Sequence, residues 1–204
     1  MKENINTEAA ILKAAETLFK EKGFKGTTTT LIAGQAGVTH AMLHYYFRTK
    51  EQIFTKVLDG YIKKMHDNFK QSMSHTSLDD TICSATASLF DFFREHQGEM
   101  KVILEVAENH PDMLDKYRAG VHNMLTTAFA KHDEKISAAA QSGDTEVLSM
   151  SEILETIIFS TYSTFALLPL AKLVLTGDLD SFFEHRKQQT IEAVRCMTQK
   201  KHDK

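Results

Sequence analysis

Two short helix-forming segments meet at Gly37. The first follows a run of four threonines, with Thr27 as its expected N-cap, and extends to Ala36. The second follows Thr39 and covers residues 40–46. Glycine readily adopts the left-handed conformation that ends a helix, so these lengths predict a helix-turn-helix. An amphipathic segment over residues 7–22 precedes it, with Thr7 as the expected N-cap and Gly23 as the C-cap.

The rest of the chain also has helical spacing. Only two Pro and nine Gly occur in 204 residues, which favours long helices. Apolar spacing predicts helices over residues 50–74, 78–96, 99–109, 112–140, 146–176 (with a kink at Pro169) and 179–199. We therefore expect an all-α fold of about nine helices: a three-helix DNA-binding domain over residues 1–50, then a helical bundle over residues 51–204.

Charge is distributed unevenly along the chain. The formal net charge is -3, but residues 1–50 contain seven Lys and Arg against four Asp and Glu, whereas the remainder contains 17 against 23. A basic N-terminal part can approach phosphates while the acidic remainder favours solubility.

The sequence favours a protein of the cytoplasm. The first ten residues lack the apolar core of a signal peptide. The apolar stretch from Phe165 to Leu175 is interrupted by Pro169 and is too short to span a bilayer, so no membrane partner is expected. Cys83 and Cys196 are expected to be free thiols, as in a reducing compartment.

Residues 23–54, GFKGTTTTLIAGQAGVTHAMLHYYFRTKEQIF, resemble the tetracycline-repressor (TetR) family. The resemblance covers about the first quarter of the chain and implies a ligand-responsive repressor, which binds a palindromic operator as a dimer and is released by a small molecule. The matching features are Gly23-Phe24, Thr27, Ile32-Ala33, Ala36-Gly37-Val38, Leu43, Tyr45-Tyr46-Phe47 and Lys50-Glu51.

The third helix is expected to enter the major groove with its N-terminal residues towards the base edges. Its outward face comprises Thr39, His40, Ala41, Met42 and His44. Phosphate contacts need donors and cations around this helix, and the candidates are Thr27, Thr28, His44, Tyr45 and Lys50. The resemblance adds Thr30 as a base-contacting residue.

Each of these residues also has a simpler interpretation. Tyr45 could pack against the first helix, and His40 could be a solvent-facing polar residue. His40 and His44 are spaced as a metal pair, but no third ligand is suggested nearby, so no metal is expected. The third helix contains no Lys or Arg, and His40 stands where the family often has Lys.

The middle helices are expected to form an effector pocket, although the same side chains suit an ordinary core. The pocket candidates are Phe92, Phe93, Met100, Leu104, Met113, Tyr117, Met124 and Tyr162. The resemblance implies a homodimer through the last two helices, 150–176 and 179–199. A broad apolar face there comprises Ile153, Leu154, Ile157, Ile158, Tyr162 and Phe165.

Enzyme activity is not expected. The chain has no pair of Glu-x-x-His motifs on two helices, no phosphate-binding glycine loop and no nucleophile motif, and nothing indicates a cofactor. Two alternatives remain open: an activator of the same fold, and a helical interaction protein that has lost DNA binding.

Overall fold

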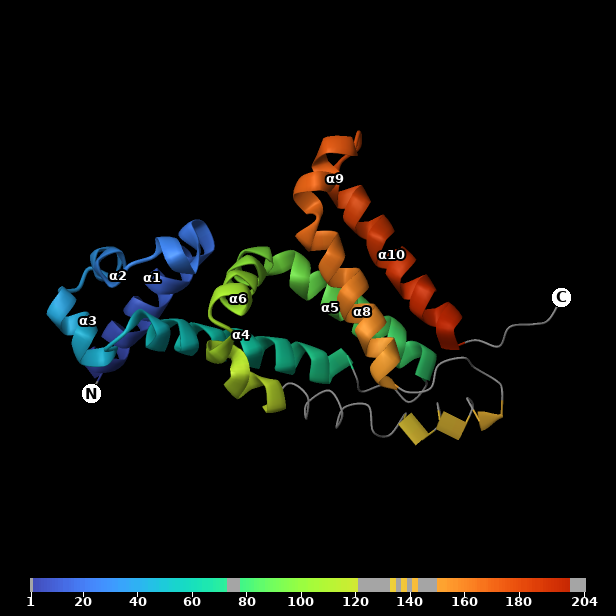
Figure 1. Ribbon diagram of the computed structural model, residues 1–204, viewed down its shortest axis with the longest axis horizontal. Helices are drawn as coiled ribbons and strands as arrows, with labels where there is room; N and C mark the ends of the chain where they lie inside the picture. Colours follow the sequence, from blue (N-terminus) through green and yellow to red (C-terminus); the bar gives the residue numbers. More distant parts are fainter. Residues whose placement is uncertain are drawn as a thin grey trace. The chain divides into compact units, whose positions relative to one another are not determined.

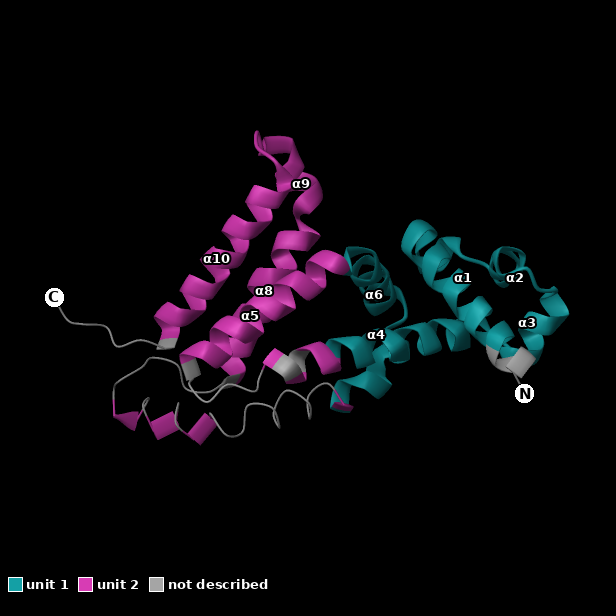
Figure 2. Ribbon diagram, turned by 180° about the vertical axis from the view of Figure 1, so that it is seen from behind, with its two compact units in different colours: residues 1–65, 96–119 teal, residues 66–95, 120–204 magenta. Residues whose placement is uncertain are grey.

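The computed structural model describes residues 2–72, 78–120, 133–134, 137–138, 141–142 and 150–198. All the elements assigned within these ranges are helical, which confirms the all-α prediction. Packing divides the chain into two units, residues 1–65 with 96–119 and residues 66–95 with 120–204 (Figure 2). Because these units follow packing and not function, the proposed domain boundary at residue 50 stays a prediction.

The first unit is built around the N-terminal helix α1. Both α2 and α6 pack against α1, and α3 packs against α2. The α-helices of this unit are labelled in Figure 1: α1 (Lys2–Gly26), α2 (Thr29–Ala36), α3 (His40–Tyr46), the first part of α4 (Lys50–Ser72) and α6 (Gln97–Asn109). The unit also contains the 3₁₀ helix η1 (Pro111–Leu114).

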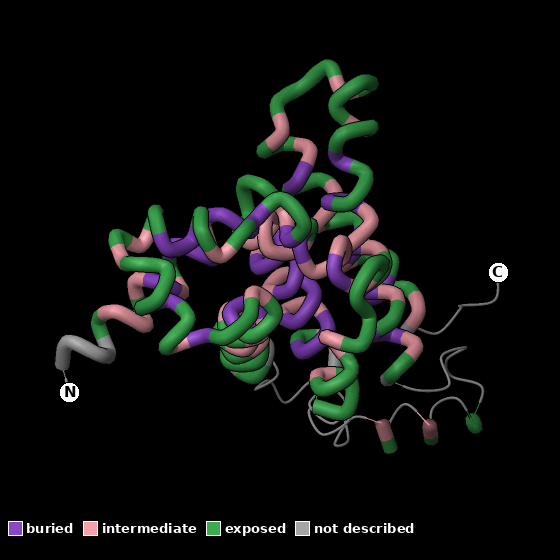
Figure 3. The backbone as a smooth tube through the Cα atoms, turned by 60° about the vertical axis from the view of Figure 1, so that its left-hand side comes forward, coloured by how far each residue is buried: buried purple, intermediate pink, exposed green. Residues whose placement is uncertain are grey.

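The core of this unit comes from one apolar face of each helix. Leu18 and Phe19 of α1 and Leu43 of α3 are buried; Figure 3 shows such buried positions in purple. Removing each of these side chains from water stabilises the fold by about 1.5–3 kcal/mol. Ile32, Ala33 and Phe47 are also buried, and Ala36 and Val38 are half-buried.

Helix α1 differs from its predicted bounds at both ends. It begins at Lys2, so Thr7 lies inside the helix and does not cap it. Gly23 interrupts the helix with φ 72° and ψ 176°, but helical hydrogen bonding continues to Gly26. Glycine adopts this positive φ without the steric cost that a Cβ would impose.

The second unit contains α5 (Leu78–Glu95), α8 (Met150–Ala166), α9 (Leu168–Val174) and α10 (Leu179–Thr198). Helices α5, α8 and α10 pack pairwise around an aromatic cluster. In this cluster the Phe165 ring lies 5.1 Å from Phe90 and 5.3 Å from Phe183, centroid to centroid. Arg195 of α10 also donates two hydrogen bonds of 2.9 Å to Asp79 of α5, which lower the pKa of that carboxyl.

The predicted helix over residues 146–176 is bent in the structure. Its described part forms α8 and α9, bent by 61° with Leu167 at the break. Pro169 therefore lies in the first turn of α9, where its missing N–H costs no helical hydrogen bond. Among the described residues no single helix is long and apolar enough to cross a membrane, and only the bent α8–α9 pair meets that test of length and composition.

The predicted helix over residues 112–140 is described only near its start. Residues 111–114 form η1 and residues 115–120 are α-helical. Most of the remainder of that prediction lies outside the described residues.

Leu43 anchors α3 to the core, so shortening it should destabilise the first unit. We expect Leu43→Ala to lower the free energy of unfolding by about 2–5 kcal/mol, because it leaves a cavity in a fully buried site. Met42→Ala is the matched control, since Met42 is 47% exposed and its loss should cost less than about 0.5 kcal/mol. Urea denaturation measures both, and equal costs would contradict the core position of Leu43.

Candidate nucleic-acid interface

Side-chain caps and one glycine set the angle between α2 and α3. Thr28 Oγ1 accepts a hydrogen bond from Leu31 N at 3.2 Å, and Thr39 Oγ1 accepts one from Met42 N at 3.1 Å. Gly37 ends α2 in the left-handed conformation, with φ 68° and ψ 27°. The predicted junction at Gly37 and the predicted Thr39 cap are confirmed.

Thr27 was predicted as the cap of α2, and that prediction was wrong. Thr28 caps the helix, whereas Thr27 is 1% exposed and its hydroxyl donates to Gly23 O at 2.8 Å. This hydrogen bond uses the Thr27 hydroxyl to satisfy a carbonyl at the break in α1. Such a buried side chain does not support the predicted phosphate contact by Thr27, so Thr28 is the stronger candidate of the two.

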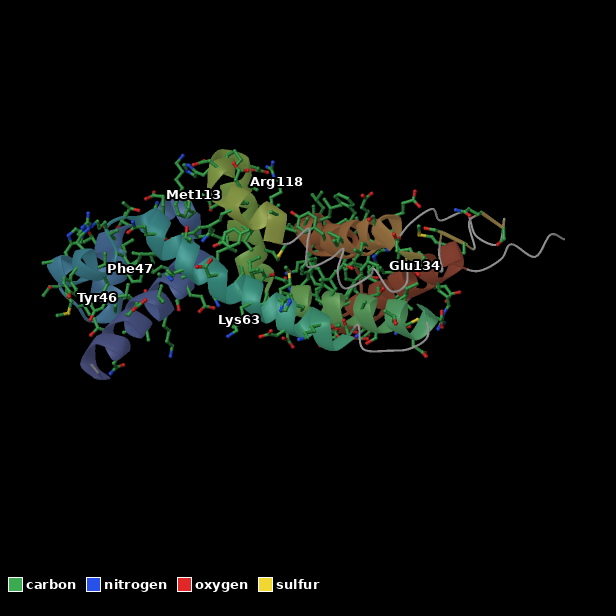
Figure 4. The ribbon with its side chains drawn as sticks, turned by 90° about the horizontal axis from the view of Figure 1, so that it is seen from below. Tyr46, Phe47, Lys63, Met113, Arg118 and Glu134 are labelled. Carbon is green, nitrogen blue, oxygen red and sulfur yellow. The ribbon has the colours of Figure 1, made fainter. Side chains whose placement is uncertain are left out.

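The outward face of α3 is open to solvent. Leu43 and Phe47 point into the core, and Phe47 is labelled beside Tyr46 in Figure 4. Tyr45 is 79% exposed, so it does not pack against α1 as the alternative interpretation required. The exposed candidates from the sequence are Thr28, Thr30, Thr39, His40, Ala41, Met42, His44 and Tyr45, and Lys50 is half-buried.

His40 is held by Thr29, a residue that is not among the candidates predicted from the sequence. Thr29 Oγ1 lies 3.1 Å from His40 Nε2, and the rings of His40 and His44 meet edge to face with centroids 4.3 Å apart. These contacts restrict the His40 rotamer and orient its ring on the exposed face. The signal was present in the sequence, because Thr29 begins α2 and a hydroxyl there can reach the start of α3.

Arg48 is a second exposed residue outside the set of candidates predicted from the sequence. It is exposed immediately beyond α3 and is the only Lys or Arg between residues 26 and 49. A guanidinium always carries a positive charge and suits phosphate geometry. A count of Lys and Arg between Gly26 and the start of α4 would have identified Arg48 from the sequence.

Lys50 makes an internal contact that the sequence did not reveal. Its Nζ donates to Phe24 O at 2.8 Å and lies 4.2 Å from the centre of the Phe24 ring. The Phe24 ring also packs 5.2 Å from Phe54 of α4. Lys50 therefore joins the start of α4 to the end of α1, whatever further contact it makes.

A charged cluster joins α1 to the N-terminal end of α6. Lys20 Nζ lies 3.3 Å from Glu99 Oε1 and 3.2 Å from Glu16 Oε1, and His96 Nδ1 lies 3.1 Å from Glu99 Oε1. Burial alone would raise the pKa of Glu99, but the His96 hydrogen bond and the Lys20 charge outweigh it and lower that pKa. Gly98 leaves room for the Lys20 side chain, since a Cβ there would lie 3.1 Å from it.

The predicted effector-pocket residues are divided between the two units of the structure. Met100, Leu104, Met113 and Tyr117 belong to the first unit, Phe92, Phe93 and Tyr162 belong to the second, and Met124 lies outside the described residues. Phe92 and Phe93 are buried in the aromatic core.

Two of the pocket candidates in the first unit have identified polar contacts. Tyr117 Oη lies 2.5 Å from Asp59 Oδ1 and 3.0 Å from Thr55 O, and burial with the Asp59 charge raises the Tyr117 pKa. Met100 Sδ accepts a hydrogen bond from Tyr61 Oη at 3.0 Å. Both contacts lie within the first unit and are consistent with a structural role.

A small cavity does occur in the first unit, between α1, α4 and α6. It has a volume of about 20 Å³ and is lined mainly by apolar side chains, including Phe19, Phe54, Leu58 and Val102. This is room for about one water molecule, and none of the predicted pocket residues lines it. Within the described ranges, no three His, Cys, Asp or Glu side chains are grouped to hold a metal ion.

The family described as "Bacterial regulatory proteins, tetR family" matches residues 11–57, which cover α1, α2, α3 and the start of α4. The N-terminal part of the chain thus matches the TetR family over this segment. YhgD of Bacillus subtilis, an HTH-type transcriptional regulator, is 27% identical over 106 residues, 52% of this chain and 56% of that protein. KstR2 of Mycolicibacterium smegmatis, an HTH-type transcriptional repressor, is 24% identical over 50% of this chain and 51% of its own length. The chain thus spans about half the length of the curated relatives it matches.

Solved structures share the fold over almost the whole chain. A TetR family transcription regulator from Marinobacter aquaeolei is 17% identical with a TM-score of 0.66, covering 94% of this chain and 97% of that one. The ketosteroid transcriptional regulator KstR2 of Mycobacterium tuberculosis is 16% identical with a TM-score of 0.64, covering 95% of each chain. At these identities the likeness establishes the TetR fold.

The Thr28 cap should contribute measurably to the stability of this TetR-type domain. We expect Thr28→Ala to lower the free energy of unfolding by about 0.5–2 kcal/mol, since Leu31 N loses its partner. Thr28→Ser should restore most of that loss. Thr30→Ala, at an exposed position two residues further on, is the control and should be nearly neutral. If Thr28→Ser is as destabilising as Thr28→Ala, the capping hydrogen bond is not the cause.

Proposed function

We propose that this chain is a cytoplasmic transcriptional regulator that binds a palindromic operator as a homodimer. The observation that carries the proposal is the exposed face of α3, capped by Thr39 and anchored by Leu43, in a TetR-family domain. A helix of this size enters the major groove, and two such helices on a symmetric dimer match two half-sites.

We assign base-edge contacts to the start of α3 and phosphate contacts to the residues around it. His40 can exchange hydrogen bonds with a base edge, and the exposed Met42 can pack on a thymine methyl group. Thr39 and Ala41 lie on the same exposed face, and Thr30 reaches it from α2. Phosphates are bound by Thr28, His44 and Tyr45, to which we add Arg48.

An exposed apolar surface on α8 and α9 supports dimerisation. Leu173 is 80% exposed and Phe159 68% exposed, and Leu167, Leu170 and Val174 are exposed beside them in sequence. Monomeric proteins rarely expose large clusters of apolar side chains, so a second copy is the proposed cover. The sequence favoured other residues, but Ile153, Leu154, Ile157 and Phe165 are buried within the subunit, and Ile158 and Tyr162 are half-buried.

Release by a small molecule is part of the proposal. An effector can shift the protein off its operator only if it binds the two conformations with different affinity. KstR2 of Mycolicibacterium smegmatis is named as a repressor, which supports repression over activation for this chain. The absence of Lys and Arg from α3 is the observation that favours the alternative, a helical interaction protein without DNA binding.

Salt-dependent DNA binding distinguishes the proposed regulator from an interaction protein without DNA binding. We expect the protein to bind DNA from upstream of its own gene, and His40→Ala to weaken specific binding by about tenfold through loss of a base contact. Arg48→Gln should weaken binding to all sequences and reduce the slope of log affinity against log salt by about 1. Fluorescence anisotropy at four salt concentrations measures both effects.

Lys64→Gln is the matched control for Arg48→Gln, because Lys64 is an exposed cation on α4 outside the proposed interface. Its affinity and salt slope should equal those of the wild type. Binding with no preference over unrelated DNA, or none at all, would favour the interaction-protein alternative.

The dimer has a separate test in solution. We expect Leu173→Glu to convert the dimer into a monomer in sedimentation velocity, because a carboxylate would be buried in an apolar interface. Ala9→Glu adds the same charge at an exposed position of α1 and should leave the dimer intact. A dimer that withstands Leu173→Glu at micromolar concentration would place the interface elsewhere.

A further inference from the structure

The end of α1 is held by a carboxylate from a helix eighty residues away in sequence. Glu105 of α6 accepts hydrogen bonds from Phe24 N at Oε2 and from Lys25 N at Oε1, both at 2.8 Å. The break at Gly23 turns these two amides towards α6. Hydrogen bonds from amides to a carboxylate are roughly twice as strong as neutral ones.

The carbonyl of Phe24 is held by a side chain of the opposite charge, that of Lys50. Phe24 O accepts the 2.8 Å hydrogen bond from Lys50 Nζ, so Phe24 is tied by its N–H to α6 and by its C=O to α4. Its ring is 2% exposed and packs edge to face on His110, 5.4 Å away, just beyond the end of α6. Backbone and ring together fix the point from which the chain continues into α2.

Glycine at position 23 is required by this arrangement. A Cβ there would lie 2.5 Å from Glu105 Oε2, and the φ of 72° is itself unfavourable for a residue with a side chain. The approach of the carboxylate and the shape of the backbone therefore depend on the same position.

We propose that Glu105 is a positioning residue for DNA binding. By fixing Phe24 and Lys25 it sets where α2 and α3 begin relative to α6, although it lies outside the domain that the family match covers. Thr27 transmits the constraint, since its hydroxyl donates to Gly23 O directly before the capped start of α2. This role rests on the proposed function, because Glu105 would act through α3, the helix proposed to bind DNA.

Glu105→Gln tests the proposal at nearly constant shape. The amide keeps one acceptor oxygen but places an N–H₂ group against a backbone N–H. We expect specific DNA affinity to fall about tenfold, with the salt slope unchanged, because no phosphate contact is lost. Glu108→Gln is the matched control: it makes the same change at an exposed position of the same helix and should bind as the wild type does.

A double-mutant cycle measures the coupling between Gly23 and Glu105 in the absence of DNA. Gly23→Ala should shift the urea midpoint less in a Glu105→Ala background than in the wild type, because the clash with the carboxylate is gone while the unfavourable φ remains. Additive shifts would overturn the steric link between Gly23 and Glu105.

The outcomes separate the inference from the proposed function. If the wild type binds its operator and folded Glu105→Gln binds it equally well, the positioning role is wrong and the proposed function stands. A salt slope reduced by about 1 would instead show that the variant has lost a phosphate contact, which also contradicts positioning. Failure of the wild type to bind any DNA specifically would overturn both.

Discussion

The backbone at Phe24 is the constraint on which the first unit depends. An acidic side chain from α6 holds its N–H, and a basic side chain from α4 holds its carbonyl. Because α1 breaks at Gly23, the Phe24 N–H would otherwise lack the partner that a continuous helix supplies, whereas Phe24 O also accepts a hydrogen bond from Thr27 N at 3.3 Å. Three helices distant in sequence are thus joined at one residue, and α2 begins at Thr29, five residues beyond Phe24.

The position of α3 depends on the backbone at Phe24 through a series of local hydrogen bonds. Thr27 closes onto Gly23 O, Thr28 caps α2, and Gly37 with Thr39 turns the chain into α3. The Thr29–His40 contact then orients a ring on the exposed face. Each step uses a short polar side chain, so the direction of α3 depends on a chain of specific contacts as well as on apolar burial.

The second unit is stabilised by an aromatic core and also exposes apolar side chains on α9. Its aromatic cluster uses Phe90, Phe165 and Phe183 for the core. Beyond the bend at Leu167, Leu168 of α9 is buried but Leu170, Leu173 and Val174 are exposed. The periodic pattern on α8 could not distinguish these uses, because apolar residues that face a neighbouring helix and those that face a partner subunit have the same spacing. Burial in the folded chain separates Ile153 from Phe159.

The sequence by itself determined the helical fold, the junction at Gly37, the Thr39 cap and most residues of the exposed α3 face. These follow from local rules: helical periodicity, glycine's positive φ and the preference of threonine for caps. Only the tertiary structure decided that Thr28 and not Thr27 caps α2, that Lys50 binds the Phe24 carbonyl, and that Glu105 holds two amides of α1. The Lys50 and Glu105 contacts join residues 26 to 81 positions apart, and they exist only after separate helices pack, so no local pattern encodes them.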